Sequence, residues 1–141
     1  MKLKTLSWFL WPLLVMGIIG IWWSVSGRST ESAGKRIYLQ QCSNCHMERG
    51  QGLRGLVPPL ANADYLQGLS VGELSCIIRY GQNDTITVNG RVYDRPMPAN
   101  ELITEVELSA LVNFIRMEWG GATSKESHQS IVANLEDCQQ D

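Results

Sequence analysis

Five consecutive residues, Cys42-Ser43-Asn44-Cys45-His46, constrain this 141-residue chain more than any other stretch. Two cysteines three positions apart, with a histidine directly after the second, form the attachment signature of a c-type haem. Each thiol adds to one vinyl group at the edge of the macrocycle, so the two sulfurs have to lie one turn apart. The histidine then turns under the porphyrin face, where an imidazole nitrogen binds iron. The motif therefore predicts one covalent haem c, held by Cys42, Cys45 and His46.

Two other classes of site use paired cysteines, and neither fits the rest of the sequence. A zinc site needs a second pair of ligands, yet Cys76 and Cys138 are single and His128 is the only other histidine. A thioredoxin-like dithiol follows a strand in a βαβ pattern, which this chain lacks. The sequence near the motif also offers no catalytic constellation, so we expect neither an enzyme nor a site for a small-molecule substrate.

The first 27 residues predict one transmembrane anchor. The 22 residues from Thr5 to Ser26 are uncharged and would span roughly 33 Å as a helix, enough for a hydrocarbon core. Tryptophans lie toward both ends of the run, as in aromatic belts. Lys2 and Lys4 precede it and predict a cytoplasmic N-terminus. We therefore expect a single-pass protein of the bacterial inner (cytoplasmic) membrane, with its haem domain on the periplasmic side.

A cleaved secretory signal peptide is the alternative reading of this segment. Signal peptides have apolar cores of about 7–15 residues that end at a small-x-small site. The run here is longer and ends in tryptophans, and Ser24-Val25-Ser26-Gly27 is a poor cleavage site. Both readings export the domain, as attachment of a c-type haem requires.

The remaining sequence predicts short helices and one small hairpin. Helices are expected at residues 31–41, 71–80 and 104–120, with a helical turn at residues 62–66 and a weak helix at residues 130–135. Ser70 with Glu73, and Thr104 with Glu107, have the spacing of capping boxes. Alternating residues around Asn89-Gly90 predict the hairpin.

These features divide the chain into an anchor at residues 1–27, a linker at 28–33, a haem domain at 34–121 and an acidic C-terminal tail at 122–141. The net charge of the whole chain is −2. Beyond residue 27 it is −4, because Lys2 and Lys4 drop out and leave 10 basic against 14 acidic residues. The absence of a basic excess excludes nucleic acid as a partner.

A haem protein that transfers electrons needs a second axial ligand, and a methionine thioether is the usual one. Met47 adjoins His46 and cannot reach the opposite face, and Met117 belongs to an amphipathic helix. Met97 lies between two prolines, which stiffen its loop at a low cost in entropy. We therefore predict His46 and Met97 as the iron ligands. His128 and an open or different ligand are the alternatives.

The haem motif, the Pro58-Pro59-Leu60 segment and the Met97-Pro98 loop, in this order, resemble class I (mitochondrial-type) cytochrome c over roughly residues 33–120. With the N-terminal segment, the resemblance is to a membrane-anchored bacterial form. It implies an all-α fold of three to five short helices around one covalent haem, here with a small hairpin insertion and one preceding transmembrane helix. The Asn-Gly insertion departs from the smallest members of the family.

The resemblance also implies two contacts. The first and last helices should cross where Gly34 and Tyr38 meet Phe114. Pro58, twelve residues after His46, should offer its carbonyl to the second nitrogen of that imidazole. Such a bond fixes the orientation and basicity of a ligand histidine.

In function, the resemblance implies a membrane-anchored cytochrome that carries single electrons between periplasmic faces of respiratory complexes. Its partners would be redox proteins or such a complex. The alternative is a fixed haem c subunit of a terminal oxidase, a quinol-oxidising complex or a nitric-oxide-type reductase. A gas sensor or haem peroxidase with an open distal site is a third class, against which Met97 argues.

Haem attachment leaves Cys76 and Cys138 over. In an oxidising compartment they could pair and clip the tail onto the helix at residues 71–80. Otherwise Cys76 is a buried apolar residue and Cys138 a tail thiol. We expect no disulfide.

Overall fold

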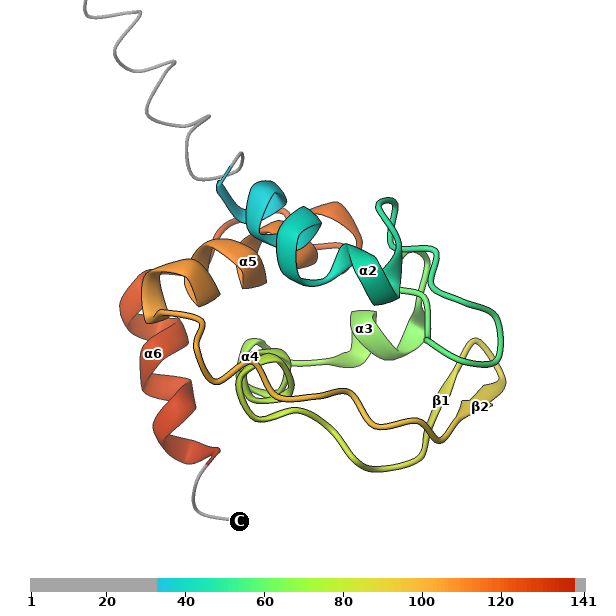
Figure 1. The fold of residues 1–141 in the computed structure, drawn as a ribbon. Coiled ribbons are helices and arrows are strands. Elements are labelled where there is room, and N and C mark those ends of the chain that lie inside the picture. Colours follow the sequence, from blue (N-terminus) through green and yellow to red (C-terminus); the bar gives the residue numbers. More distant parts are fainter. Residues whose placement is uncertain (1–32, 139–141) are drawn as a thin grey trace, which may run out of the picture.

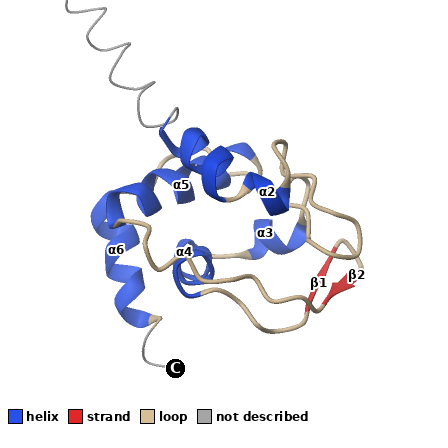
Figure 2. Ribbon diagram, viewed as in Figure 1, coloured by secondary structure: helices blue, strands red, loops and turns tan. Residues whose placement is uncertain are grey.

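The computed structural model describes residues 33–138, which form a mostly helical fold with one two-stranded hairpin (Figures 1 and 2). A helix at residues 33–41 comes first. It is followed by α2 (Ser43–His46), α3 (Asp64–Gly68), α4 (Val71–Tyr80), β1 (Ile86–Val88), β2 (Arg91–Tyr93), α5 (Glu105–Glu118) and α6 (His128–Asp137). The predicted anchor, residues 1–27, lies outside the described residues. Within residues 33–138, no helix is both long and apolar enough to cross a membrane.

Two capping boxes fix where α4 and α5 begin. The Ser70 hydroxyl accepts the Glu73 N–H at 3.2 Å, and the Glu73 carboxylate accepts the Ser70 N–H at 2.8 Å. Thr104 and Glu107 exchange the same pair of bonds, at 3.3 and 3.0 Å. Each box satisfies backbone donors that the first turn of a helix leaves unpaired. Both predicted boxes, and the predicted bounds of α4, are confirmed.

The capping glutamates make a prediction about acid stability. Hydrogen bonds from Ser70 and Thr104 lower the pKa of Glu73 and of Glu107 below the ordinary 4.5. The unfolded chain therefore takes up these protons first, so the stabilisation is present above pH 4.5 and is lost as the pH falls below it. Glutamine keeps the capping bond and does not titrate. We expect the double variant Glu73→Gln, Glu107→Gln to lose less stability than wild type between about pH 6 and about pH 3 in urea unfolding.

The matched control for this experiment is Glu105→Gln. Glu105 also lies in the first turn of α5, but its side chain takes no part in a capping box. Parallel acid dependence in wild type and the double variant would contradict the prediction.

The helix at residues 33–41 crosses α5 at a glycine. A Cβ placed on Gly34 would lie 2.6 Å from the Phe114 Cβ and would collide with the carbonyl oxygen of Ala110. The Tyr38 and Phe114 rings meet at 5.7 Å between centroids. The predicted crossing of the first and last helices of the haem domain is therefore present.

Trp119, just after α5, extends this contact into a three-ring cluster that we did not predict. Its ring meets Tyr38 at 4.9 Å and Phe114 at 5.5 Å, edge-on in both cases. Tyr38 is fully buried, and its hydroxyl donates to the Met47 carbonyl at 2.6 Å. Burial raises the pKa of Tyr38, so the hydroxyl stays a donor. The crossing thus fixes the turn that follows His46.

The hairpin pairs Ile86 with Tyr93 around an Asn89-Gly90 turn, in which both residues have positive φ. Asn89 also fastens the turn to the start of α3. Its side-chain oxygen accepts the Asp64 N–H at 3.1 Å, and its own N–H donates to the Asp64 carboxylate at 2.7 Å. The predicted hairpin is confirmed, and it is tied to the body of the fold.

The C-terminal helix is longer than predicted and packs against α4 and α5. Ile131 and Leu135, four residues apart, are buried in the core. This packing brings Cys138 to Cys76 of α4, with 5.7 Å between their Cα atoms, and the two form a disulfide. Our expectation of no disulfide was wrong. The weak helix predicted at residues 130–135 is present within α6, but the sequence did not reveal that Ile131 and Leu135 reach the core.

Candidate cofactor site

His46 is the last residue of α2, and its side chain is buried. Two backbone bonds, from Cys42 N–H to Tyr38 O and from His46 N–H to Cys42 O, continue the first helix through the CxxCH motif. The imidazole Nδ1 lies 3.1 Å from the Pro58 carbonyl oxygen. A carbonyl only accepts, so Nδ1 carries the proton and the lone pair of Nε2 is free. The bond that the resemblance implied is present.

Burial shifts the pKa of the His46 imidazole and of the Cys42 thiol in opposite directions. It lowers the pKa of His46, with the Pro58 carbonyl opposing it, so the ring is neutral as iron ligation requires. Burial, and secondarily Cys45, raises the pKa of the Cys42 thiol to about 11. Before attachment of haem, Cys42 is therefore a protonated thiol rather than a reactive thiolate.

Three adjoining cavities, of about 160, 70 and 390 Å³, open around the motif. Among the described residues, His46 and Met97 are the two that line all three. Cys42 lines two of the cavities, and so does Cys45. The smallest of the three, of about 70 Å³, is called the innermost cavity below. Its wall consists mainly of apolar side chains from α3, α4, the hairpin and α5: Leu66, Leu74, Ile77, Ile78, Ile86, Val88 and Ile115.

The Met97 loop is bound to the end of α4 by a backbone pair. Met97 N–H donates to Gln82 O at 2.8 Å, and Gln82 N–H donates to Met97 O at 3.0 Å. Gln82 is held in turn, because its side-chain amide donates to the Tyr65 hydroxyl at 2.7 Å. Both Gln82 and Tyr65 line the innermost cavity with Met97. Sequence reasoning missed them, since nothing local marks a pairing across fifteen positions.

Two further contacts hold the rest of this loop. Asn100 donates its N–H to Ile78 O at 3.1 Å and its side-chain amide to Gln41 at 2.6 Å. The Arg79 guanidinium donates to the Ile103 carbonyl at 2.6 Å. The loop that carries Met97 is therefore attached both to α4 and to the first helix.

The conformation of Gly81 leads to a testable prediction about how the Met97 loop is held against the end of α4. Its φ is +80° with an extended ψ, a conformation open essentially to glycine, and a Cβ there would lie 2.6 Å from the Met97 carbonyl oxygen. We expect Gly81→Ala to cost roughly 1–3 kcal/mol of stability and to displace the loop. Urea unfolding measures the first effect, and the sulfur-to-iron absorption band of the oxidised protein measures the second.

Gly68→Ala is the control for this substitution. Gly68 ends α3, has no positive φ, and nothing lies within 4 Å of an added Cβ. If the two alanine variants had equal stability and an equal band, Gly81 would not be what seats the Met97 loop.

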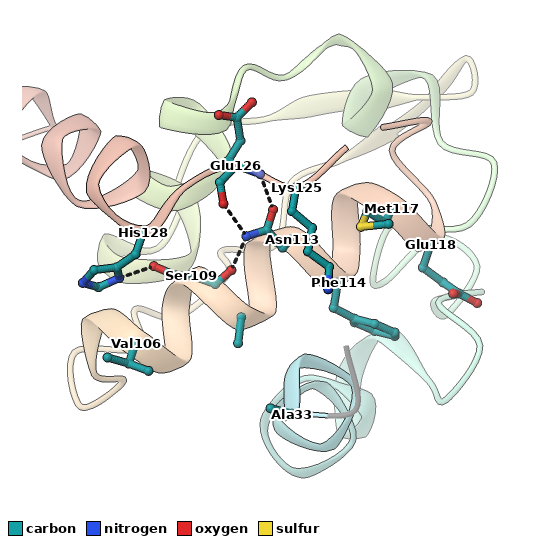
Figure 3. A pocket seen from close by; sticks show the side chains of 11 residues that line it. Ala33, Val106, Ser109, Asn113, Phe114, Met117, Glu118, Lys125, Glu126 and His128 are labelled. Atoms are coloured by element: carbon teal, nitrogen blue, oxygen red, sulfur yellow. Dashed lines mark hydrogen bonds between the residues drawn. The ribbon is translucent and has the colours of Figure 1, made fainter. Parts of the chain in front are cut away.

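The alternative ligands lie elsewhere. His128 and Met117 line a separate cavity of about 470 Å³ between α5 and the segment before α6, and neither lines the three cavities at the motif (Figure 3). His128 bonds through Nδ1 to the Ser109 hydroxyl at 2.9 Å. Met47 follows His46 directly and has a left-handed backbone, with φ of 63°. The geometry therefore favours Met97 as the partner of His46.

The donor set fits a covalent haem. Cys42 and Cys45 are free thiols at the cavity edge, and the neutral His46 and the soft thioether of Met97 share the cavities with apolar walls. Within residues 33–138, no group of three or more histidine, cysteine or acidic residues is placed to hold a metal ion. Cys42, Cys45, His46, Met97 and Pro58 remain the predicted cofactor-binding residues.

Comparison with known sequences decides the family. The cytochrome c family model matches residues 31–119. The chain belongs to the cytochrome c family. Cytochrome c-552 of Thermus thermophilus is 32% identical over 106 residues, which cover 73% of this chain and 80% of that protein. This cytochrome c is thus a monohaem electron-transfer protein of class I, not an enzyme, and its cofactor is covalent haem c.

Two more relatives of this cytochrome c are much longer proteins. The cytochrome c subunit of a quinone-type alcohol dehydrogenase from Gluconobacter oxydans is 30% identical over 90 residues, which are 63% of this chain and 19% of that subunit. A Cbb3-type cytochrome c oxidase subunit from Rhodobacter capsulatus is 26% identical over 91 residues, which are 64% of this chain and 30% of that subunit. Relatives of the domain therefore include subunits of larger complexes.

Proposed function

We propose that this cytochrome c is a membrane-anchored carrier of single electrons between periplasmic faces of respiratory complexes. The observation that carries the carrier assignment is that His46 and Met97, and no other residue of the described range 33–138, line all three cavities. If both residues bound the iron of a haem, they would hold both of its axial positions and would leave none open for a gas or a peroxide. Haem supplies a reversible one-electron change at the iron. The protein supplies the two ligands, the apolar wall and the fixed loop.

The uncharged segment Thr5–Ser26 supports the membrane anchor in this proposal. Docking would use the cavity mouth, where apolar side chains reach solvent. Leu56 lines one cavity and Leu102 another, and they are 45% and 95% exposed. A small apolar contact of this kind suits a partner that binds briefly and leaves.

A fixed subunit of a membrane respiratory enzyme is the second candidate. It is favoured by the two longer relatives, which are the cytochrome c subunit of a quinone-type alcohol dehydrogenase and a subunit of a Cbb3-type oxidase. The same haem domain would then be the entry or exit for electrons in a permanent assembly, and the anchor would pack against other membrane helices.

Extraction from native membranes separates these possibilities. We expect the haem-stained protein to resist an alkaline carbonate wash and to leave the membrane only with detergent. Release by carbonate would favour the cleaved signal peptide instead. In mild detergent, a free carrier migrates as a lone small cytochrome on a native gel, whereas a fixed subunit co-migrates with a large complex. An oxidised spectrum without the sulfur-to-iron band would contradict the His46 and Met97 assignment.

A further inference from the structure

The disulfide between Cys76 and Cys138 lies behind the wall of the cofactor cavity. On α4, Leu74 and Ile78 share one face and line the cavity, while Gly72 and Cys76 share the opposite face. That second face meets α6, since a Cβ on Gly72 would lie 2.9 Å from the Asn134 side-chain oxygen. Helix α4 therefore has the cofactor cavity on one side and α6 on the other.

Helix α6 is attached at both of its ends. Before it begins, Glu126 accepts the Asn113 side-chain amide at 3.1 Å through its carbonyl and donates its own N–H to Asn113 Oδ1 at 2.7 Å (Figure 3). Arg116 of α5 adds an ion pair to the Glu126 carboxylate at 3.4 Å. The far end has the disulfide to α4. In Figure 1, α6 lies at the opposite end of the drawn fold from the β1–β2 hairpin.

Between these two attachments α6 packs against α4 and α5, and His128 bonds to Ser109 of α5 at 2.9 Å. The core contacts of α6 come from Ile131, which is fully buried, and from Leu135, which is 7% exposed. A helix of 10 residues is marginal by itself in water, so α6 depends on its docking. The region matched by the cytochrome c family model ends at residue 119, before α6 begins. The disulfide and α6 are thus additions of this chain to the part that the family model describes.

The disulfide is reachable. Both Cys76 and Cys138 are half-buried rather than enclosed in the core, and Cys138 caps the C-terminal end of α6. Once haem is attached, Cys42 and Cys45 are thioethers and no longer exchange with thiols. Cys76 and Cys138 are then the single thiol–disulfide couple among the four cysteines of the chain.

We propose that Cys76–Cys138 is a thiol-exchange site at which a dithiol reductant releases α6 from α4. One thiolate of the dithiol attacks one sulfur of the disulfide, so a mixed disulfide forms and the other protein sulfur leaves as a thiolate. The second thiol of the reductant then displaces the first protein sulfur. The reductant ends as a disulfide, and the protein gains two electrons and two protons. The outer support of α4 is lost while the haem stays attached.

Hydrogen exchange on the holoprotein tests this proposal, with dithiothreitol as the dithiol probe. The reference sample is reduced with ascorbate, which reduces haem iron and leaves disulfides intact, so both samples contain ferrous haem. Mass spectrometry after alkylation counts the opened thiols at Cys76 and Cys138. We expect cleavage without denaturant and an exchange rate of the α6 amides at least about tenfold faster, with a smaller rise in α4 and none in the first helix.

A double variant, Cys76→Ser with Cys138→Ser, is the matched control, because it lacks the couple and should show fast α6 exchange in both reductants. Should this variant fail to accumulate, the two wild-type samples decide the matter alone. A disulfide that dithiothreitol opens only in denaturant would overturn the proposal, since the site would then be closed to exchange. Cleavage with unchanged protection of α6 would overturn it too, because the helix would be held without the disulfide.

Discussion

Replacing Met97 by alanine is expected to abolish the sulfur-to-iron absorption band of the oxidised protein and to lower the midpoint potential by about 0.1 V or more, given the range over which axial ligands set haem potentials. Methionine as an axial ligand favours the reduced iron, and its removal leaves that position to a weaker or harder donor. Because both backbone bonds between Met97 and Gln82 remain, the loop should keep its path. Spectroscopy and a redox titration at one pH measure the two effects.

Met117→Ala is the control for this variant. Met117 lines the separate cavity between α5 and the segment before α6, so its removal takes away a thioether without touching the site at His46. A band that survives Met97→Ala, or one that disappears in Met117→Ala, would overturn the ligand assignment. The carrier function would then need another basis.

Gly34→Ala is expected to destabilise the protein, although helix propensity alone predicts the opposite sign. Alanine inside a helix is favoured over glycine by about 1 kcal/mol. Here the new Cβ would meet the Phe114 Cβ at 2.6 Å and the backbone of Ala110, so the helices must move apart. Overpacking of this kind costs roughly 1–3 kcal/mol, or more where backbone is in the way. Thermal or urea unfolding of the holoprotein gives the sign.

The same measurement on Gly68→Ala, which meets nothing, should show little change or a small gain. A Gly34→Ala protein more stable than wild type would show that the first helix does not rest directly on α5.

Short-range signals in the sequence predicted most of the local structure. Four consecutive residues are enough to predict each capping box, and the pair Asn89-Gly90 is enough to predict the hairpin turn. Backbone preferences and nearby hydrogen bonds decide such features before any long-range packing. The family resemblance predicted the hydrogen bond between His46 and the Pro58 carbonyl, because the proline lies twelve residues after the haem histidine in the family and in this chain.

Long-range packing decided the features that the sequence did not reveal. The Gln82 amide meets the Tyr65 hydroxyl, and Trp119 meets Tyr38, only because the helices cross as they do. The disulfide depends on where α6 docks, and the sequence of α6 did not show that Ile131 and Leu135 would be its buried hydrophobic residues. The predicted weak helix at residues 130–135 is present, but a short apolar pattern does not say which helices it packs against.

The clamp between the hairpin turn and α3 has a consequence for the rate at which an electron moves. Asn89 and Asp64 lock the turn in both directions, and the hairpin thereby holds Ile86 and Val88 against the innermost cavity. Apolar side chains that are fixed in place carry almost no dipoles that could reorient when a bound haem iron gains or loses one electron. We therefore expect the hairpin to lower the energy needed to rearrange the surroundings during each transfer, although it provides neither of the predicted iron ligands.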